Sequence, residues 1–270
     1  DPIKKHHVDP FGGRKDIEAQ RLRYVDRLTF GRDPLRILRV ARFTSQFEFN
    51  PSGDLYTLCG QLSLDGVASE RIEQELRSIW LKSRKPSAGL RFLDAVKAMQ
   101  KRFPQWVYLC NERCFKRVDR AVDSKIGLAG IDAAMMWTSA MADMSLSEGE
   151  MLLNALNIKR FDGIDMHSLI LNGMKNWQIL LSAKTNADLF RLSDQIEMEY
   201  LIRVAENIGG ENLCLLRDKI IKLGISKKAP PHLLRGQDLV DIGYRGPDIG
   251  KSLSMIRDLQ LDGHIRSKEE

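Results

Sequence analysis

The stretch Gly31–Phe43, with the sequence GRDPLRILRVARF, decides how the rest of the chain is interpreted. Asp33 followed by Pro34 is typical of a helix start, because Asp caps the first free N–H groups and Pro at the first helical position loses no hydrogen bond. The sequence therefore predicts a helix that begins here. The apolar side chains of this helix are expected to turn toward a core, namely Leu35, Leu38 and Phe43.

Arginines recur every three residues along this helix, at Arg36, Arg39 and Arg42, so they form one stripe with Asp33 at its N-terminal end. Guanidinium groups at this spacing repel one another unless an anion lies across them, and they match phosphates and base edges better than lysine does. An acceptor and a donor three residues apart also suit the amino group and ring acceptor of cytosine or adenine. The stripe is therefore interpreted as a nucleotide site; the alternative is a solvated arginine face on which Asp33 is only a cap.

The composition describes a chain that can bury a substantial core. Of its 270 residues 43% are hydrophobic, and Lys and Arg outnumber Asp and Glu by 42 to 36. The first 43 residues hold eleven basic and six acidic side chains, so most of the net charge of +6 lies there. This local excess indicates contacts with the phosphates of a polyanion. No apolar run has the length that spans a membrane, so no membrane partner is expected.

Four cysteines are too few and too scattered for a disulfide framework, which suits a reducing compartment such as the cytoplasm. Cys110 and Cys114 stand one helical turn apart, but no second pair or nearby His completes a zinc set. They are interpreted as buried thiols. His167, His232 and His264 are too far apart in sequence to suggest a cluster, so no metal site is expected in this sequence.

The N-terminal segment Ile3–Phe11, IKKHHVDPF, is typical of a strand that enters a turn at Asp9 and Pro10. Gly12 and Gly13 then allow the backbone to bend. A lone strand needs a sheet, and nothing downstream has enough β-branched alternation to supply one. The partners of this strand are therefore expected to precede the first residue.

Three segments follow one another in the first third of the chain. They are DPFGGRKDIE at Asp9–Glu18, RDPLRILRVARF at Arg32–Phe43 and ERIEQEL at Glu70–Leu76. In order, spacing and content they resemble consecutive motifs of the class II tRNA nucleotidyltransferase family, which contains CCA-adding enzymes, their CC- and A-adding specialists and bacterial poly(A) polymerases. One such motif is a weak signal, whereas three in order across about 70 residues are specific.

The resemblance implies a mainly α, elongated molecule with a multi-helix neck, body and tail and a short remnant of the head β-sheet at the N-terminus. The implied parts are the end of the head and the hinge in residues 1–28, the nucleotide-templating neck in 29–95, a helical body in 96–225 and a tRNA-binding tail in 226–270. Asp9, Gly12 and Gly13 would form the hinge from head to neck.

In this family the second motif acts as an amino-acid template for the incoming CTP or ATP. The resemblance assigns base recognition to Asp33 and Arg36 and places Arg39 and Arg42 in the same nucleotide site. The residue before the templating Asp is commonly acidic in the family, where it orients the neighbouring Arg through a salt bridge. Here that residue is Arg32, and this departure bears on base selectivity.

The family's catalytic carboxylates form a D-x-D pair on a head strand before the hinge, and this sequence contains no such pair. They would hold the Mg²⁺ that the resemblance implies as cofactor. The implied enzyme is a nucleotidyltransferase that adds C and/or A to the 3′ end of tRNA, with tRNA, CTP and ATP as partners. Two alternatives stay open: a poly(A) polymerase of the same family, and a non-catalytic RNA-binding module if no head precedes the first residue.

Further along, Ser69 is expected to cap a helix with an acidic first turn. Glu75 on this helix is within reach of a neck arginine, but an i,i+4 pair with Arg71 is the more common outcome.

The segment Leu233–Gly250 resembles the tail of the same family. Its basic residues Arg235 and Arg245, with Lys251 just beyond, are candidate contacts to the tRNA backbone. Asp248, which follows a proline, is expected to be a first-turn acid of the last helix.

Overall fold

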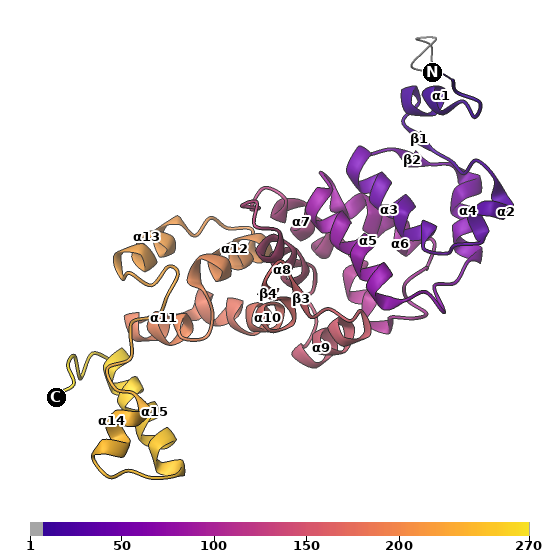
Figure 1. Ribbon diagram of the computed structural model, residues 1–270. Helices are drawn as coiled ribbons and strands as arrows, with labels where there is room; N and C mark the ends of the chain where they lie inside the picture. The colour runs from indigo at the N-terminus through magenta and orange to yellow at the C-terminus, as the bar shows by residue number, and fades with distance from the viewer. Residues whose placement is uncertain (1–7, 270) are drawn as a thin grey trace. The chain divides into compact units, whose positions relative to one another are not determined.

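The computed structural model describes residues 8–269 and consists mainly of α-helices, as the sequence predicts (Figure 1). The chain divides into two compact units, one that runs up to Met174 and one that begins at Lys175. This boundary lies inside the predicted body, and the division into hinge, neck, body and tail stays a prediction. No helix among residues 8–269 is both long and apolar enough to cross a membrane.

The first unit is built from helices joined by turns and short loops. Its helices are α1 (Gly13–Glu18), α2 (Arg27–Gly31), α3 (Arg36–Phe47), α4 (Gly53–Gln61), α5 (Ser69–Lys82), α6 (Pro86–Ala95), the 3₁₀ helix η1 (Pro104–Leu109), α7 (Glu112–Ala121), α8 (Ala129–Ala140), α9 (Leu146–Ala155) and the first part of α10 (Met166–Ser182).

Strands are few and short in the part of the chain that is described. β1 (Arg21–Leu22) pairs in parallel with β2 (Asn50–Pro51), and β3 (Arg160–Phe161) pairs antiparallel with β4 (Ile164–Asp165). The segment predicted as a strand that enters a turn at Asp9 and Pro10 lies outside the described residues as far as residue 7. Pro10 and Phe11 form a turn, so the turn is confirmed. The turn forms because the Asp9 carboxylate accepts the first N–H groups of α1 and so bends the chain.

Helix α3 begins two residues later than predicted. Asp33 does act as a cap, since its Oδ1 accepts the N–H of Leu35 at 3.2 Å. However, the residues from Asp33 to Leu35 form a tight turn with bonds between residues three apart, and the regular helix starts at Arg36. Leu35 and Leu38 are buried as expected, whereas Phe43 is only half-buried, so its assignment to the core is wrong.

Helix α3 packs between α5 and α6, and its contact with α6 is close. The N–H of Gly89 on α6 donates to Ser45 Oγ at 2.9 Å, and Ser45 Oγ donates to the carbonyl of Pro86 at 3.3 Å. A Cβ atom at Gly89 would lie 2.5 Å from the carbonyl oxygen of Ala41. Only glycine therefore permits this helix crossing.

The rest of the first unit surrounds an apolar core. Trp80 of α5 and Trp137 of α8 meet edge to face, with ring centroids 5.2 Å apart. Five further apolar side chains of α8, α9 and the residue after α9 are fully buried in this core, namely Met135, Met136, Leu152, Leu153 and Leu156. Core positions are predictable here because these helices bury nearly continuous apolar faces.

The second unit continues α10 and adds five helices. They are α11 (Asn186–Ser193), α12 (Met198–Gly209), α13 (Cys214–Lys222), α14 (Gly236–Asp241) and α15 (Pro247–Leu261). The connection between α13 and α14 is not helical, and the buried Arg257 of α15 fixes it by donating to the carbonyl of Pro230 at 2.8 Å and to Asp194 of α11 at 2.8 Å. Asp248 lies in the first turn of α15, as predicted.

Candidate functional site

The predicted hinge residues meet at the start of α1. Asp9 accepts the N–H groups of Gly13 at 2.8 Å and of Arg14 at 3.0 Å, and these bonds, the one from Arg14 first, hold the pKa of the Asp9 carboxyl below its usual value. Gly12 has a φ of +73°, which favours glycine. Arg23 connects this turn to the following strand by donating to Asp16 at 2.6 Å and to the carbonyl of Phe11.

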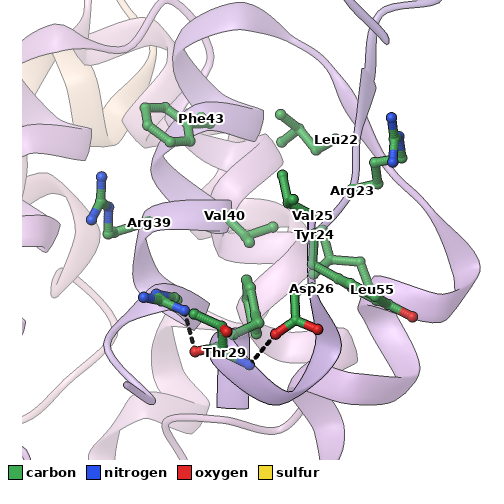
Figure 2. Close-up of a pocket in the computed structure, with 12 residues that line it drawn as sticks. Leu22, Arg23, Tyr24, Val25, Asp26, Thr29, Arg39, Val40, Phe43 and Leu55 are labelled. Atoms are coloured by element: carbon green, nitrogen blue, oxygen red, sulfur yellow. Dashed lines mark hydrogen bonds between the residues drawn. The ribbon is translucent and has the colours of Figure 1, made fainter. Parts of the chain in front are cut away.

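A pocket of about 450 Å³ lies beside α3 (Figure 2). Most of its wall is apolar or aromatic, formed by Leu22, Tyr24, Val25, Phe30, Val40, Phe43 and Leu55. Thr29 adds a polar group, and the charged lining residues are Arg23, Asp26, Arg36 and Arg39. Three guanidinium groups against one carboxylate give the pocket an excess of positive charge, and its flat aromatic side chains suit a planar ring.

The arginine stripe is divided between this pocket and α5. Arg36 donates to the carbonyl of Thr29 and lies 6.0 Å from the centre of the Phe30 ring. The exposed guanidinium of Arg39 lines the same pocket, and within residues 8–269 it has no hydrogen-bond or ion-pair partner. Arg42 instead pairs with Glu75 of α5 at 2.9 Å and is not among the pocket-lining residues.

Asp33 also lies outside the pocket lining. Its Oδ2 pairs with Arg71 of α5 at 3.3 Å, so α5 holds the stripe at two points, through Arg71 and through Glu75. Of the two outcomes considered for Glu75, contact with an arginine of the stripe is confirmed, because Glu75 pairs with Arg42. The more common i,i+4 pair with Arg71 does not form, because Arg71 pairs with Asp33. The structure thus brings Arg36 and Arg39 together but places Asp33 and Arg42 against α5.

The predicted cap of α5 is also wrong. Ser69 is the first residue of the helix and its side chain makes no cap bond. Its hydroxyl instead accepts from Arg102 at 3.0 Å, and Arg102 also donates to the carbonyls of Leu64 and Val67. Arg102 thus fixes the loop before α5 from outside the helix, through a contact that local sequence patterns do not predict.

Asp26 is a pocket residue that the sequence analysis missed. It is the N-cap of α2, and its Oδ1 accepts the N–H of Thr29 at 2.6 Å. The hydrogen bonds from Thr29 hold the pKa of the Asp26 carboxyl below its usual value, so the group is ionised at neutral pH. The available signal was an Asp three residues before Thr29 ahead of a short helix, which is a typical N-cap pattern.

The predicted RNA contacts occupy two separate hollows of the second unit. Arg245 and Lys251 line one, together with Tyr244. Arg235 lines the other, beside Arg257. The structure therefore brings Arg245 and Lys251 together and places Arg235 apart from them.

Within the described residues no group of three or more His, Cys, Asp or Glu side chains is placed to hold a metal ion. The resemblance assigns the Mg²⁺ ligands to carboxylates on a head strand before the hinge and none of them to these residues. Cys114 is buried and Cys110 half-buried, and both are free thiols. Burial raises the pKa of each thiol to about 12.

No family model matches the chain. Over 105 residues it is 40% identical to the Multifunctional CCA protein of Stenotrophomonas maltophilia (strain K279a), a stretch that covers 36% of this chain and 25% of that protein. The chain therefore spans about a quarter of the length of the curated relatives that it matches.

The likeness in fold extends over nearly the whole chain. One match is a solved CCA-adding enzyme in complex with ATP. The aligned region covers 97% of this chain and 63% of the enzyme's chain, with 20% sequence identity and a TM-score of 0.64. Another match is the Thermotoga maritima CCA-adding enzyme complexed with tRNA_CCA. The aligned region covers 97% of this chain and 65% of that enzyme's chain, with 20% sequence identity and a TM-score of 0.58. The resemblance carried by the three motifs is thus confirmed: the chain is similar to CCA proteins in sequence over about a third of its length and to CCA-adding enzymes in fold.

Proposed function

We propose that the protein is a template-independent RNA nucleotidyltransferase that adds C and/or A to the 3′ end of tRNA, with CTP and ATP as its nucleotide partners. The observation that carries the proposal is the pocket beside α3, where Arg36 and Arg39 stand over an apolar and aromatic wall. Arginines suit the phosphates and aromatic rings suit the base of a nucleotide. The likeness in fold to the Thermotoga maritima CCA-adding enzyme complexed with tRNA_CCA supports tRNA as the other substrate. The location that we propose with this role is the cytoplasm.

Base selection is the part of the reaction that we assign to this chain. Asp33 and Arg36 would present an acceptor and a donor to the incoming base, with Arg39 and Arg42 in the same nucleotide site. Cytosine and adenine each carry an amino donor next to a ring acceptor, whereas uracil and guanine carry a carbonyl oxygen in place of that amino group. For Asp33 to serve in this way its carboxylate has to exchange Arg71 for the base, because Arg71 is its partner in the structure.

The proposed cofactor is Mg²⁺, which in such enzymes neutralises charge on the triphosphate and activates the attacking hydroxyl. The described residues bind and select the nucleotide and contribute no metal cluster.

Binding of tRNA is assigned to the second unit. Arg245 and Lys251 lie around one hollow with the aromatic ring of Tyr244, an arrangement suited to a backbone phosphate and an adjacent nucleoside. Arg235 would add a separate contact.

The test is nucleotide incorporation by the full-length protein in the presence of Mg²⁺. A tRNA that ends before its C-C-A sequence is incubated with each labelled nucleotide, and we expect CTP and ATP to be incorporated and UTP and GTP to be refused. Polymerisation of ATP alone on unrelated RNA would favour the poly(A) polymerase. Binding of tRNA with no incorporation of any nucleotide would favour the non-catalytic module.

A further inference from the structure

The pocket beside α3 contains one carboxylate, and it is not the one that the motif assigns. Of the twelve residues that line the pocket, Asp26 alone is acidic, and Asp33 is not among them (Figure 2). Asp33 is engaged with Arg71 and with the N–H of Leu35. The acceptor that faces the pocket therefore comes from the loop before α2.

A single residue, Thr29, holds this acceptor beside a donor. Asp26 accepts the N–H of Thr29 at 2.6 Å, and Arg36 donates to the carbonyl of the same residue. Figure 2 shows the bond between Asp26 and Thr29 as a dashed line. The N–H and the C=O of Thr29 are a few ångströms apart, and Asp26 and Arg36 both line the pocket. The carboxylate and the guanidinium therefore lie on either side of Thr29 in the same pocket.

Both groups keep capacity for a ligand. An ionised carboxylate has about four lone-pair sites and a guanidinium has five N–H donors, so the bonds to Thr29 use only part of each. Arg39 adds a further positive charge to the lining of the pocket, whereas Arg23 is paired with Asp16 at 2.6 Å. Tyr24, Phe30 and Phe43 add aromatic rings to the same lining. A planar ring bearing an amino donor next to a ring acceptor matches this pair, and a phosphate matches the arginines.

We infer that Asp26 is a further base-selecting residue, whose carboxylate accepts the exocyclic amino group of cytosine or adenine while Arg36 donates to the adjacent ring acceptor. Uracil and guanine would direct a carbonyl oxygen at the carboxylate, which can only accept, and so would be refused. This inference rests on the proposed function, since it names the residue that selects the nucleotide at the same site. The structure also bears on Arg32. In the family an acidic residue at this position orients the neighbouring Arg, and here the carbonyl of Thr29 accepts from Arg36.

The test compares Asp26→Ser with two matched variants in the full-length protein. Serine caps a helix about as well as Asp, so Asp26→Ser removes the carboxylate and keeps the start of α2. Asp33→Asn is the rival base-selecting position. Asp54→Ser is the control: Asp54 is an exposed acid in the first turn of α4 of the same unit, outside the pocket, and its loss changes the net charge equally.

The readout is kcat/KM for each of the four nucleotides on a tRNA that ends before C-C-A, together with thermal unfolding of each variant. We expect Asp26→Ser to lower the preference for CTP over UTP, and for ATP over GTP, about tenfold or more, with an unchanged melting temperature. Asp54→Ser should keep the wild-type preference. If Asp26→Ser fails to fold, Asp26→Asn keeps the cap and replaces one acceptor oxygen by a donor, so it carries the same test.

Wild-type preference in Asp26→Ser, or in Asp26→Asn if that variant is used, overturns the inference. If Asp33→Asn loses the preference in the same experiment, the proposed function stands without it. If the wild-type protein incorporates neither CTP nor ATP on the tRNA, the proposed function and the inference both fail.

Discussion

At the scale of single residues, Thr29 is the point at which the charged groups of the pocket are fixed. Its backbone ties Arg36 to the short helix α2, so the guanidinium is held in place before a ligand arrives. A donor that is already oriented loses less conformational freedom on binding than a free arginine side chain does. Arg39, which has no such partner among residues 8–269, is free to move onto a phosphate.

Replacing Arg36 by alanine should lower kcat/KM for CTP and for ATP alike. Its donors face a ring acceptor that both bases offer, and a hydrogen bond from a charged group contributes about 1.5–3 kcal/mol. We expect a loss of about tenfold or more for both nucleotides, measured by incorporation into tRNA. If Arg36→Ala only lowers the melting temperature and leaves both rates unchanged, the stripe is a solvated face that supports the fold.

Replacing Asp33 separates capping from base selection. Asp33→Ala should lower the free energy of unfolding by about 1 kcal/mol, because the turn before α3 loses its cap. Asp33→Asn should restore that stability, since Asn caps nearly as well, but should discriminate less well between CTP, ATP, UTP and GTP. Unfolding in urea measures the first effect and nucleotide incorporation the second. Equal discrimination by wild-type protein and Asp33→Asn would leave Asp33 with a structural role alone.

The cysteines give a prediction of pH dependence. Burial raises the pKa of Cys59, Cys110 and Cys114 to about 12, so these thiols stay protonated at pH 8 and their thiolate fraction grows only as the pH approaches 12. Cys214 is exposed. A thiol-specific disulfide reagent at pH 8 should therefore modify one thiol rapidly in the folded protein and all four after unfolding. Rapid modification of more than one thiol in the folded protein would contradict the burial of Cys59, Cys110 and Cys114.

At the scale of elements, the sequence predicted those features that depend on residues within a few helical turns of one another. The helix after Asp33, the first-turn acid Asp248 and the burial of Leu35 and Leu38 follow from spacing along a few turns. The pairing of Arg71 with Asp33 joins residues 38 positions apart, and the choice between Asp33 and Glu75 as its partner depends on how α5 lies against α3. That arrangement is set by packing, which the spacing of charges along one helix does not determine.

The close contact of α3 with α6 should make Gly89 intolerant of a side chain. In Gly89→Ala the new Cβ would lie 2.3 Å from Ser45 Oγ and 2.5 Å from the carbonyl oxygen of Ala41, so α6 has to move away from α3. Overpacking of this kind costs about 1–3 kcal/mol, and unfolding in urea measures it. Gly53→Ala is the matched control, because Gly53 has nothing within 4 Å of the added atom. Equal stability of the two variants would show that the helices adjust without strain.

At the scale of the whole molecule, two compact units carry two parts of the proposed function. The first unit contains the arginine stripe and the pocket proposed for the nucleotide, and the second contains the basic hollows proposed for tRNA. The three motifs, which lie within about 70 residues of one another, assign the nucleotide site to the stripe. Of the four residues assigned, Arg36 and Arg39 line the pocket beside α3. The motifs left Asp26 unnoticed, since its role arises only where the loop before α2 folds against α3.

This division predicts that charge in the second unit controls tRNA affinity and leaves nucleotide affinity unchanged. The double variant Arg245→Ala, Lys251→Ala removes two cations from one hollow and leaves the buried Arg257 with its bonds to Asp194 and Pro230 intact. Deleting the residues after 226 would break those bonds, so the double variant is the cleaner change. For each tRNA phosphate that the variant no longer neutralises, the slope of log affinity against log salt concentration should become shallower by about 1.

We therefore expect the double variant to bind tRNA more weakly and with a shallower salt dependence, measured by filter binding at several salt concentrations. Affinity for CTP, measured by calorimetry, should equal that of the wild type. Lys222→Ala, an exposed cation on α13 outside both hollows, controls for the loss of general positive charge in the same unit. If it weakens tRNA binding as much per charge as the double variant does, the attraction is a diffuse effect of net charge. If only the double variant changes the slope, the hollow around Tyr244 holds the phosphates.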